Sequence, residues 1–172
     1  MPDYAAAAMN LEHGPIVLAY DGSPAARQAV TAAAALMPSR KTLVITVWEP
    51  ALGHAAMAPP PLATSTATLV VDPPAGTDVV GDQRASAQRL SNEGAEFARS
   101  LGLDADPIAT VDASTVASTI IEVAARHDAA AIVVGSRGMS GLRARLEGST
   151  SKQVVKRAPC PVVVVHDAAD SD

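Results

Sequence analysis

Aromatic residues make up only 2% of this chain of 172 residues, and cysteine occurs once. The single cysteine, Cys160, excludes an intramolecular disulfide and fits a reducing compartment, so we expect a cytoplasmic protein. No apolar run approaches the roughly 18 residues that a membrane-spanning helix needs. The formal net charge of −5 argues against attraction of the whole surface to nucleic acid or to an anionic membrane. Any anion site must therefore be local.

Signatures of metal binding and of nucleophilic catalysis are also missing. The four histidines form no i, i+4 pair, and none has a metal-ligand spacing to the cysteine. Ser23 lies near Asp21, but no G-x-S-x-G elbow surrounds it, and a helix cap is the better interpretation. A Walker-type P-loop needs a lysine after its second glycine, whereas Ser149 follows Gly148 directly. We therefore expect neither a structural metal nor motor-type NTPase chemistry.

What the sequence does contain is small aliphatic residues in a regular pattern. Apolar residues make up 48% of the chain, enough for one domain with a sizeable core. Strand-length apolar runs alternate with segments of helical period, and 106–111 is the weakest of them. The runs cover residues 16–20, 43–48, 106–111, 130–134 and 162–165. Continuously apolar strands separated by helices predict crossover connections and a parallel sheet covered on both faces, which is a doubly wound α/β fold.

The helical segments have recognisable ends. Ser23 can cap a helix that starts at Pro24, and Pro38 stops it. Residues 90–101 repeat apolar side chains at helical spacing, and Gly102 marks the end of that helix. Two further helices are expected, over residues 116–124 and 149–157.

The expected organisation is a single domain over residues 14–167, between a flexible leader at 1–13 and a frayed tail at 168–172. Residues 49–78 collect six prolines among threonines and alanines, without any sustained period. This composition predicts a long proline-rich loop insertion within the domain. No internal repeat is present.

The chemistry concentrates between Gly135 and Thr150. Glycine stands at 135, 138 and 148, and Ser149 follows the last, which gives the spacing G-x2-G-x9-G-[ST]. Glycines after a strand let the backbone approach phosphate oxygens. A helix capped by Ser149 would turn its free N–H groups and its dipole toward the same anion. The segment therefore predicts a polyphosphate site.

Local charge supports this prediction. Residues 135–157 carry six lysines or arginines and a single acid, Glu147, within an otherwise acidic chain. Charge-assisted contacts to a polyphosphate are worth roughly 1.5–3 kcal/mol each. The bases at 152, 156 and 157 are better interpreted as the solvated face of a helix. For Arg143 and Arg145 a phosphate contact and a solvated position both stay open.

The glycine spacing resembles the ATP-binding signature of the universal stress protein family, and the likeness extends to residues 16–23 and 158–165. The resemblance implies a Rossmann-like sheet of the adenine-nucleotide alpha-hydrolase type, with strand order 3-2-1-4-5 and ATP on the glycine-rich segment. It also implies a homodimer paired through the last strand, residues 162–165. Mg²⁺ can accompany the phosphates, held mainly by their own oxygens and by water.

The implied nucleotide site has an adenosine end and a phosphate end. Asp21, after the first strand, is placed to accept hydrogen bonds from ribose hydroxyls, and its alternative role is that of a turn-former. Ala19 and Tyr20 flank the same edge, and Val47 matches the position of a main-chain contact to adenine. The residues implied at the phosphate end are Gly135, Arg137, Gly138, Gly148, Ser149 and Thr150.

The resemblance implies a regulatory stress-response module that binds ATP with little or no hydrolysis and acts on an unidentified protein partner. The alternatives are a slow ATPase, a nucleotidyl transferase, and a module that binds AMP or cyclic AMP. A transferase of related architecture is expected to have a histidine-rich signature after its first strand, and residues 20–26 contain no histidine. Residues 112–115 depart from the glycine and proline that many relatives have there, and we assign them no ligand role.

Overall fold

A computed structural model describes residues 11, 13–49, 79–112, 114–136 and 149–166. These residues form a parallel sheet of five strands in the order β3-β2-β1-β4-β5, which confirms the predicted order. The strands are β1 (Ile16–Ala19), β2 (Lys41–Trp48), β3 (Asp104–Val111), β4 (Ala131–Gly135) and β5 (Val162–Val165). The helices are α2 (Pro24–Leu36), α3 (Val79–Ser100), α4 (Val116–Arg126) and α5 (Ser149–Arg157).

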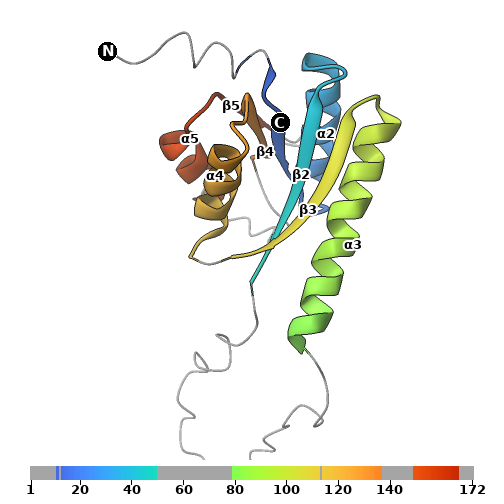
Figure 1. Ribbon diagram of the computed structural model, residues 1–172, viewed down its shortest axis with the longest axis vertical. Helices are drawn as coiled ribbons and strands as arrows, with labels where there is room; N and C mark the ends of the chain where they lie inside the picture. Colours follow the sequence, from blue (N-terminus) through green and yellow to red (C-terminus); the bar gives the residue numbers. More distant parts are fainter. Residues whose placement is uncertain (1–10, 12, 50–78, 113, 137–148, 167–172) are drawn as a thin grey trace, which may run out of the picture.

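Helices cover both faces of the sheet, as the doubly wound prediction requires. Figure 1 shows α2 and α3 on one face and α4 and α5 on the other. Two buried clusters correspond to these layers, and the neighbouring residues Val17 and Leu18 belong to different ones. Both are fully buried, because successive side chains of a strand point to opposite faces and each face here is covered.

The start of α2 is built as the sequence predicts. The Ser23 hydroxyl oxygen accepts a hydrogen bond from the N–H of Ala26 at 3.1 Å, and Pro24 is the first helical residue. The helix ends at Leu36, just before Pro38. A cap of this kind satisfies one of the free N–H groups of the first turn and fixes where the chain leaves the sheet.

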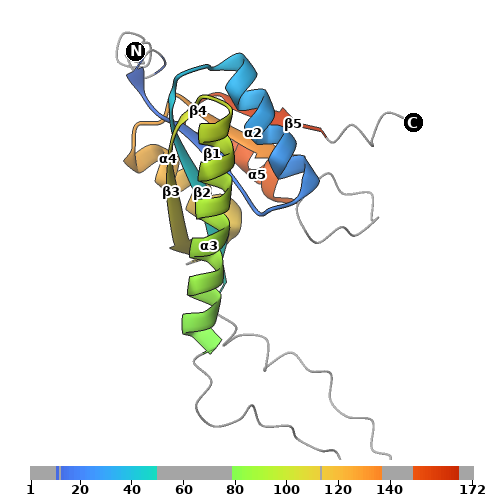
Figure 2. The same cartoon turned by 90° about the vertical axis from the view of Figure 1, so that its right-hand side faces the viewer.

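Helix α3 is longer than predicted. It begins at Val79 and contains 22 residues, whereas the apolar spacing indicates a helix only from Leu90. The first half of α3 is rich in polar residues, and Figure 2 shows this half extending past the sheet. A helix with little to cover carries no apolar stripe, so hydrophobic periodicity could not detect it. Strand ends differ from prediction by two residues or fewer.

The turn before α4 forms a regular helix start without glycine or proline. Thr115 and Ser118 make a capping box, since each side-chain oxygen accepts a hydrogen bond from the other residue's N–H at 3.1 Å. Asp112 supports the turn by accepting from the N–H of Ser114 at 2.8 Å. The departure from the family pattern at 112–115 is thus compatible with a stable helix start.

Candidate functional site

The strand order places β1 at the centre of the sheet, where the direction of winding reverses. Leu18 of β1 lies level with Val44 of β2 on one side and Val133 of β4 on the other. Helix α2 follows β1 on one face, and α5 follows β4 on the opposite face. In doubly wound sheets, ligands bind outside the carboxyl ends of the strands at this switch point. The segments after β1 and β4 therefore define the candidate site.

The segment after β1 is a tight turn organised by Asp21. One carboxylate oxygen of Asp21 accepts a hydrogen bond from the N–H of Ser23 at 3.0 Å. Between them, Gly22 has φ +78, a backbone conformation that residues with a side chain rarely adopt. Asp21 therefore has the turn-forming role that was predicted as the alternative to ribose binding. That role is compatible with ligand binding, because an ionised carboxylate offers about four acceptor positions.

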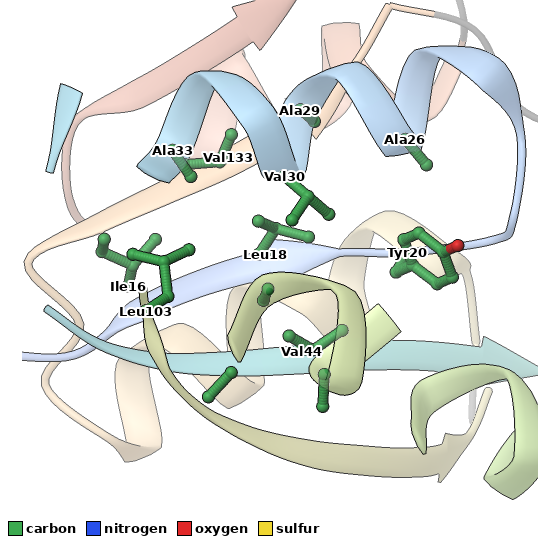
Figure 3. Packing of buried hydrophobic residues seen from close by; sticks show 13 residues of the cluster. Ile16, Leu18, Tyr20, Ala26, Ala29, Val30, Ala33, Val44, Leu103 and Val133 are labelled. Carbon is green, nitrogen blue, oxygen red and sulfur yellow. The ribbon is translucent and has the colours of Figure 1, made fainter. Parts of the chain in front are cut away.

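Tyr20 and Ala19, which flank this turn, point to opposite faces. Tyr20 is 2% exposed, and its hydroxyl donates to a carboxylate oxygen of Glu93 on α3 at 3.0 Å. Burial, with a smaller contribution from the Glu93 bond, raises the pKa of Tyr20 to about 12. Figure 3 shows Tyr20 in the same layer as Leu18 and Val44. Its side chain is committed to the α3 face.

Two residues predicted for the adenosine end lie on the other face. Ala19 of β1 and Val47 of β2 are both partly buried against the cluster under α4. The structure thus brings Ala19 and Val47 to a common face, with Asp21 just beyond the end of β1. The Tyr20 side chain is separated from them by the sheet itself.

At the end of β4, Gly135 makes room for helix α2. A Cβ placed on Gly135 would lie 2.9 Å from the backbone carbonyl carbon of Ala25 and 3.0 Å from its Cβ. Real Cβ atoms essentially never approach so closely. Close approach of helix and strand is therefore a second reason for glycine here, beside the approach of phosphate that the sequence predicts.

Ser136, directly after β4, has a buried hydroxyl with no hydrogen-bond partner in the part of the chain that the structure describes. The residue is 4% exposed, and its N–H donates to the carbonyl of Val165 at 2.8 Å. By the alternation of the strand, it follows Val134 onto the face of α4 and α5. An unpaired buried hydroxyl costs about 1–3 kcal/mol. Ser136 is not among the predicted site residues, although it stands inside the glycine-rich motif.

The phosphate end is described only in part. Ser149 and Thr150 are the first two residues of α5, where free N–H groups favour an anion. These bounds are the predicted ones, 149–157, although Ser149 is the first residue of the helix and not its cap. Lys156 and Arg157 lie in the last turn of α5 and are exposed, as their interpretation as a solvated face predicts. Arg137, Gly138 and Gly148 lie outside the described residues.

The described part of the chain has few features that indicate metal binding, a reactive thiol or a membrane span. No group of three or more histidine, cysteine, aspartate or glutamate side chains could hold a metal ion there. Cys160 is half-buried, and burial raises the pKa of its thiol, which fits a packing role. None of the described helices is both long enough and apolar enough to cross a membrane.

The five-stranded parallel sheet with helices on both faces defines a doubly wound α/β domain. A model of the universal stress protein family matches residues 13–166. A universal stress protein from Thermus aquaticus is 30% identical over 160 residues, which cover 88% of this chain and 97% of that protein. The chain belongs to the universal stress protein family.

Further similarities agree with this assignment. A universal stress protein of Mycobacterium tuberculosis is 34% identical over 82 residues, covering 48% of this chain but only 26% of that longer relative. Among solved structures, a universal stress protein in complex with cAMP matches with a TM-score of 0.60, 20% identity and coverage of 91% and 98%. One from Archaeoglobus fulgidus in complex with dAMP matches with a TM-score of 0.56, 22% identity and coverage of 89% and 98%. At these identities the structures support the fold alone.

Proposed function

We propose that this protein is a regulatory module that binds ATP at the carboxyl edge of β1 and β4, with little or no hydrolysis. The observation that carries the proposal is the switch point itself, with the Asp21 turn after β1 and the N-terminus of α5 beyond β4. Relatives of the same fold bind the adenine nucleotides cAMP and dAMP. An adenine nucleotide is therefore the ligand class that agrees best with both the fold and the family.

The nucleotide is proposed to lie with its adenosine near β1 and β2. Asp21 would accept hydrogen bonds from the ribose, with Ala19 and Val47 beside it and the backbone of Tyr20 at the same edge. The phosphates would lie against the glycine-rich segment and α5. The residues proposed there are Gly135, Arg137, Gly138, Gly148, Ser149 and Thr150. Any Mg²⁺ would be held mainly by phosphate oxygens and water.

Ser136 adds a donor to the phosphate end. Its buried hydroxyl has no hydrogen-bond partner among the described residues, and a phosphate oxygen would supply one. The chemistry of the residues present thus fits an anionic ligand. A hydrogen bond to a charged group contributes roughly 1.5–3 kcal/mol.

The proposal is tested by calorimetric titrations of wild type, Asp21→Ala and Ser136→Ala with ATP, adenosine and inorganic tripolyphosphate. Asp21→Ala is expected to lower the affinity for ATP and for adenosine and to leave the affinity for tripolyphosphate unchanged. Ser136→Ala is expected to lower the affinity for ATP and for tripolyphosphate by about tenfold or more. The lost hydrogen bond to a charged group is worth at least about 1.4 kcal/mol, which corresponds to a tenfold change in affinity. Equal losses for all three ligands in both variants would contradict the proposed orientation.

The alternatives are a slow ATPase and a module for AMP or cyclic AMP. Rapid hydrolysis needs a positioned water, a base and cations on the transferred phosphoryl group. Glu147 is the only carboxylate between residues 135 and 150, and it lies outside the described residues. Phosphate release faster than about 1 s⁻¹ that Glu147→Gln abolishes would show that the protein is an ATPase.

The alternative of a cyclic-nucleotide module has its own test. Replacement of bound ATP by cyclic AMP at equal concentration would favour cyclic AMP as the ligand.

Assembly is proposed to be a homodimer in the cytoplasm, with a regulatory protein partner still to be identified. Strand β5 stands at the edge of the sheet and consists of four valines, all partly exposed. An apolar edge strand is an aggregation hazard unless it is paired, and an isologous contact with a second copy would pair it. Light scattering at micromolar concentration is expected to give the mass of two chains. The mass of one chain would reject the dimer.

A further inference from the structure

A single carboxylate of α3 contacts both sides of the turn that follows β1. Glu93 accepts a hydrogen bond through Oε1 from the hydroxyl of Tyr20 at 3.0 Å. The same oxygen forms an ion pair with the guanidinium of Arg27. Tyr20 immediately precedes the turn, and Arg27 lies in the first turn of α2, just after it. Both ends of the Asp21–Pro24 turn are therefore tied to one atom.

Two more residues on the same face of α3 contact this region. A Cβ placed on Gly22 would lie 3.0 Å from Cδ1 of Leu90, so the turn passes directly over that side chain. A Cβ placed on Gly94 would lie 2.7 Å from two ring atoms of Tyr20, so the ring packs against the bare helix backbone. Leu90, Glu93 and Gly94 follow the i, i+3, i+4 spacing of one helix face. We call these three residues the α3 seat.

The α3 seat is held firmly by the core. Ala95, directly after Gly94, and Ala98, one turn beyond Gly94, are fully buried in the cluster on this face of the sheet. The phenol of Tyr20 keeps its proton throughout the neutral range, because its pKa is about 12. It therefore remains a donor to Glu93 at any physiological pH. The seat thus offers a fixed acceptor to two donors that flank the turn.

The Arg27–Glu93 pair is half-exposed, with side-chain exposures of 52% and 49%. Exposed ion pairs contribute only about 0–1 kcal/mol to stability. The ion pair is thus expected to fix the conformation of the Asp21–Pro24 turn and to add little to the overall free energy of unfolding. A turn held in one conformation before binding loses less entropy when a ligand arrives.

We propose that Glu93 is a positioning residue, which fixes the Asp21–Pro24 turn through Tyr20 and Arg27 and thereby sets the affinity for the adenosine end of the nucleotide. This inference rests on the proposed function, since it concerns the same site. Glu93 lies 73 residues from Tyr20 and 66 from Arg27. Its role could only emerge from the folded structure.

The test compares Glu93→Ala with Glu96→Ala, a matched control that removes the same charge from an exposed position one turn along α3. Affinities for adenosine, ATP and inorganic tripolyphosphate are measured by calorimetry. Glu93→Ala is expected to lose about tenfold in adenosine and ATP affinity, equivalent to 1.4 kcal/mol, and to keep wild-type affinity for tripolyphosphate. Glu93→Gln, which keeps an acceptor for Tyr20 but no charge for Arg27, is expected to lose less. Glu96→Ala is expected to match wild type.

A second measurement separates positioning from binding. Amide hydrogen exchange of the ligand-free proteins reports the opening of the turn, in which the Ser23 N–H is bonded to Asp21. Exchange at Ser23 is expected to be about tenfold faster in Glu93→Ala than in Glu96→Ala. Wild-type exchange and wild-type adenosine affinity in Glu93→Ala would overturn the inference, and so would an equal loss for tripolyphosphate. Failure of the wild type to bind any of the three ligands would instead reject the proposed function, whatever the exchange result.

Discussion

Gly94→Val is expected to lower the free energy of unfolding by about 3 kcal/mol, at the upper end of the usual cost of overpacking. The added side chain would start 2.7 Å from the ring of Tyr20 and 2.9 Å from Cγ1 of Val44. Tyr20 is 2% exposed and Val44 is fully buried, so neither side chain has space to move. Displacement of Tyr20 would also disturb the turn at Asp21 and weaken nucleotide binding.

Denaturant unfolding of Gly94→Ala measures whether a side chain at position 94 raises or lowers the free energy of unfolding. In an open helix position, alanine in place of glycine stabilises by about 1 kcal/mol. If the ring of Tyr20 packs where the structure places it, Gly94→Ala is destabilising instead. A variant Gly94→Ala as stable as wild type would refute the packing of Tyr20 against α3.

Gly135→Val is expected to cost about 3 kcal/mol in stability and to remove ATP binding. Its Cβ would meet the backbone carbonyl carbon of Ala25 at 2.9 Å and the carbonyl oxygen at 3.1 Å. A backbone cannot rotate away as the end of a flexible side chain can, so α2 must shift off the sheet. The shift would carry the capped start of α2, and with it the Asp21 turn, away from β4.

Calorimetry and denaturant unfolding of Gly135→Val measure the two effects separately. Loss of ATP binding with wild-type stability would mean that position 135 acts only through the approach of the phosphate. Wild-type values of both quantities would contradict the assigned contact with Ala25.

Much of the fold could be predicted from the sequence, because each buried strand is a continuous apolar run. Residues 162–165 have the predicted bounds, and Ser23 and Pro24 start α2 as predicted. The first half of α3 could not be predicted, since a helix that extends past the sheet carries no apolar stripe. Periodicity detects burial, and these residues have little to bury.

The candidate site was predictable where local chemistry determines it and not where distant residues meet. The Asp21 turn follows from aspartate, glycine and serine in succession, which favour a turn in any context. The separation of Tyr20 from Ala19 and Val47 depends on which face each residue takes after folding. Glu93 gave no signal, because its contact with Tyr20 spans 73 residues. The burial of the Ser136 hydroxyl, without a hydrogen-bond partner among the described residues, likewise depends on what surrounds it in space.

Binding of ATP to the wild-type protein is the most direct test of the proposed function. Calorimetric titration of the purified, folded protein with ATP is expected to show one saturable site per chain, with a dissociation constant on the order of micromolar. Adenosine should bind more weakly, because it lacks the phosphates that the glycine-rich segment and α5 would hold. Absence of saturable binding of ATP, AMP and cyclic AMP up to about 1 mM, a limit of only 4.1 kcal/mol, would contradict the account.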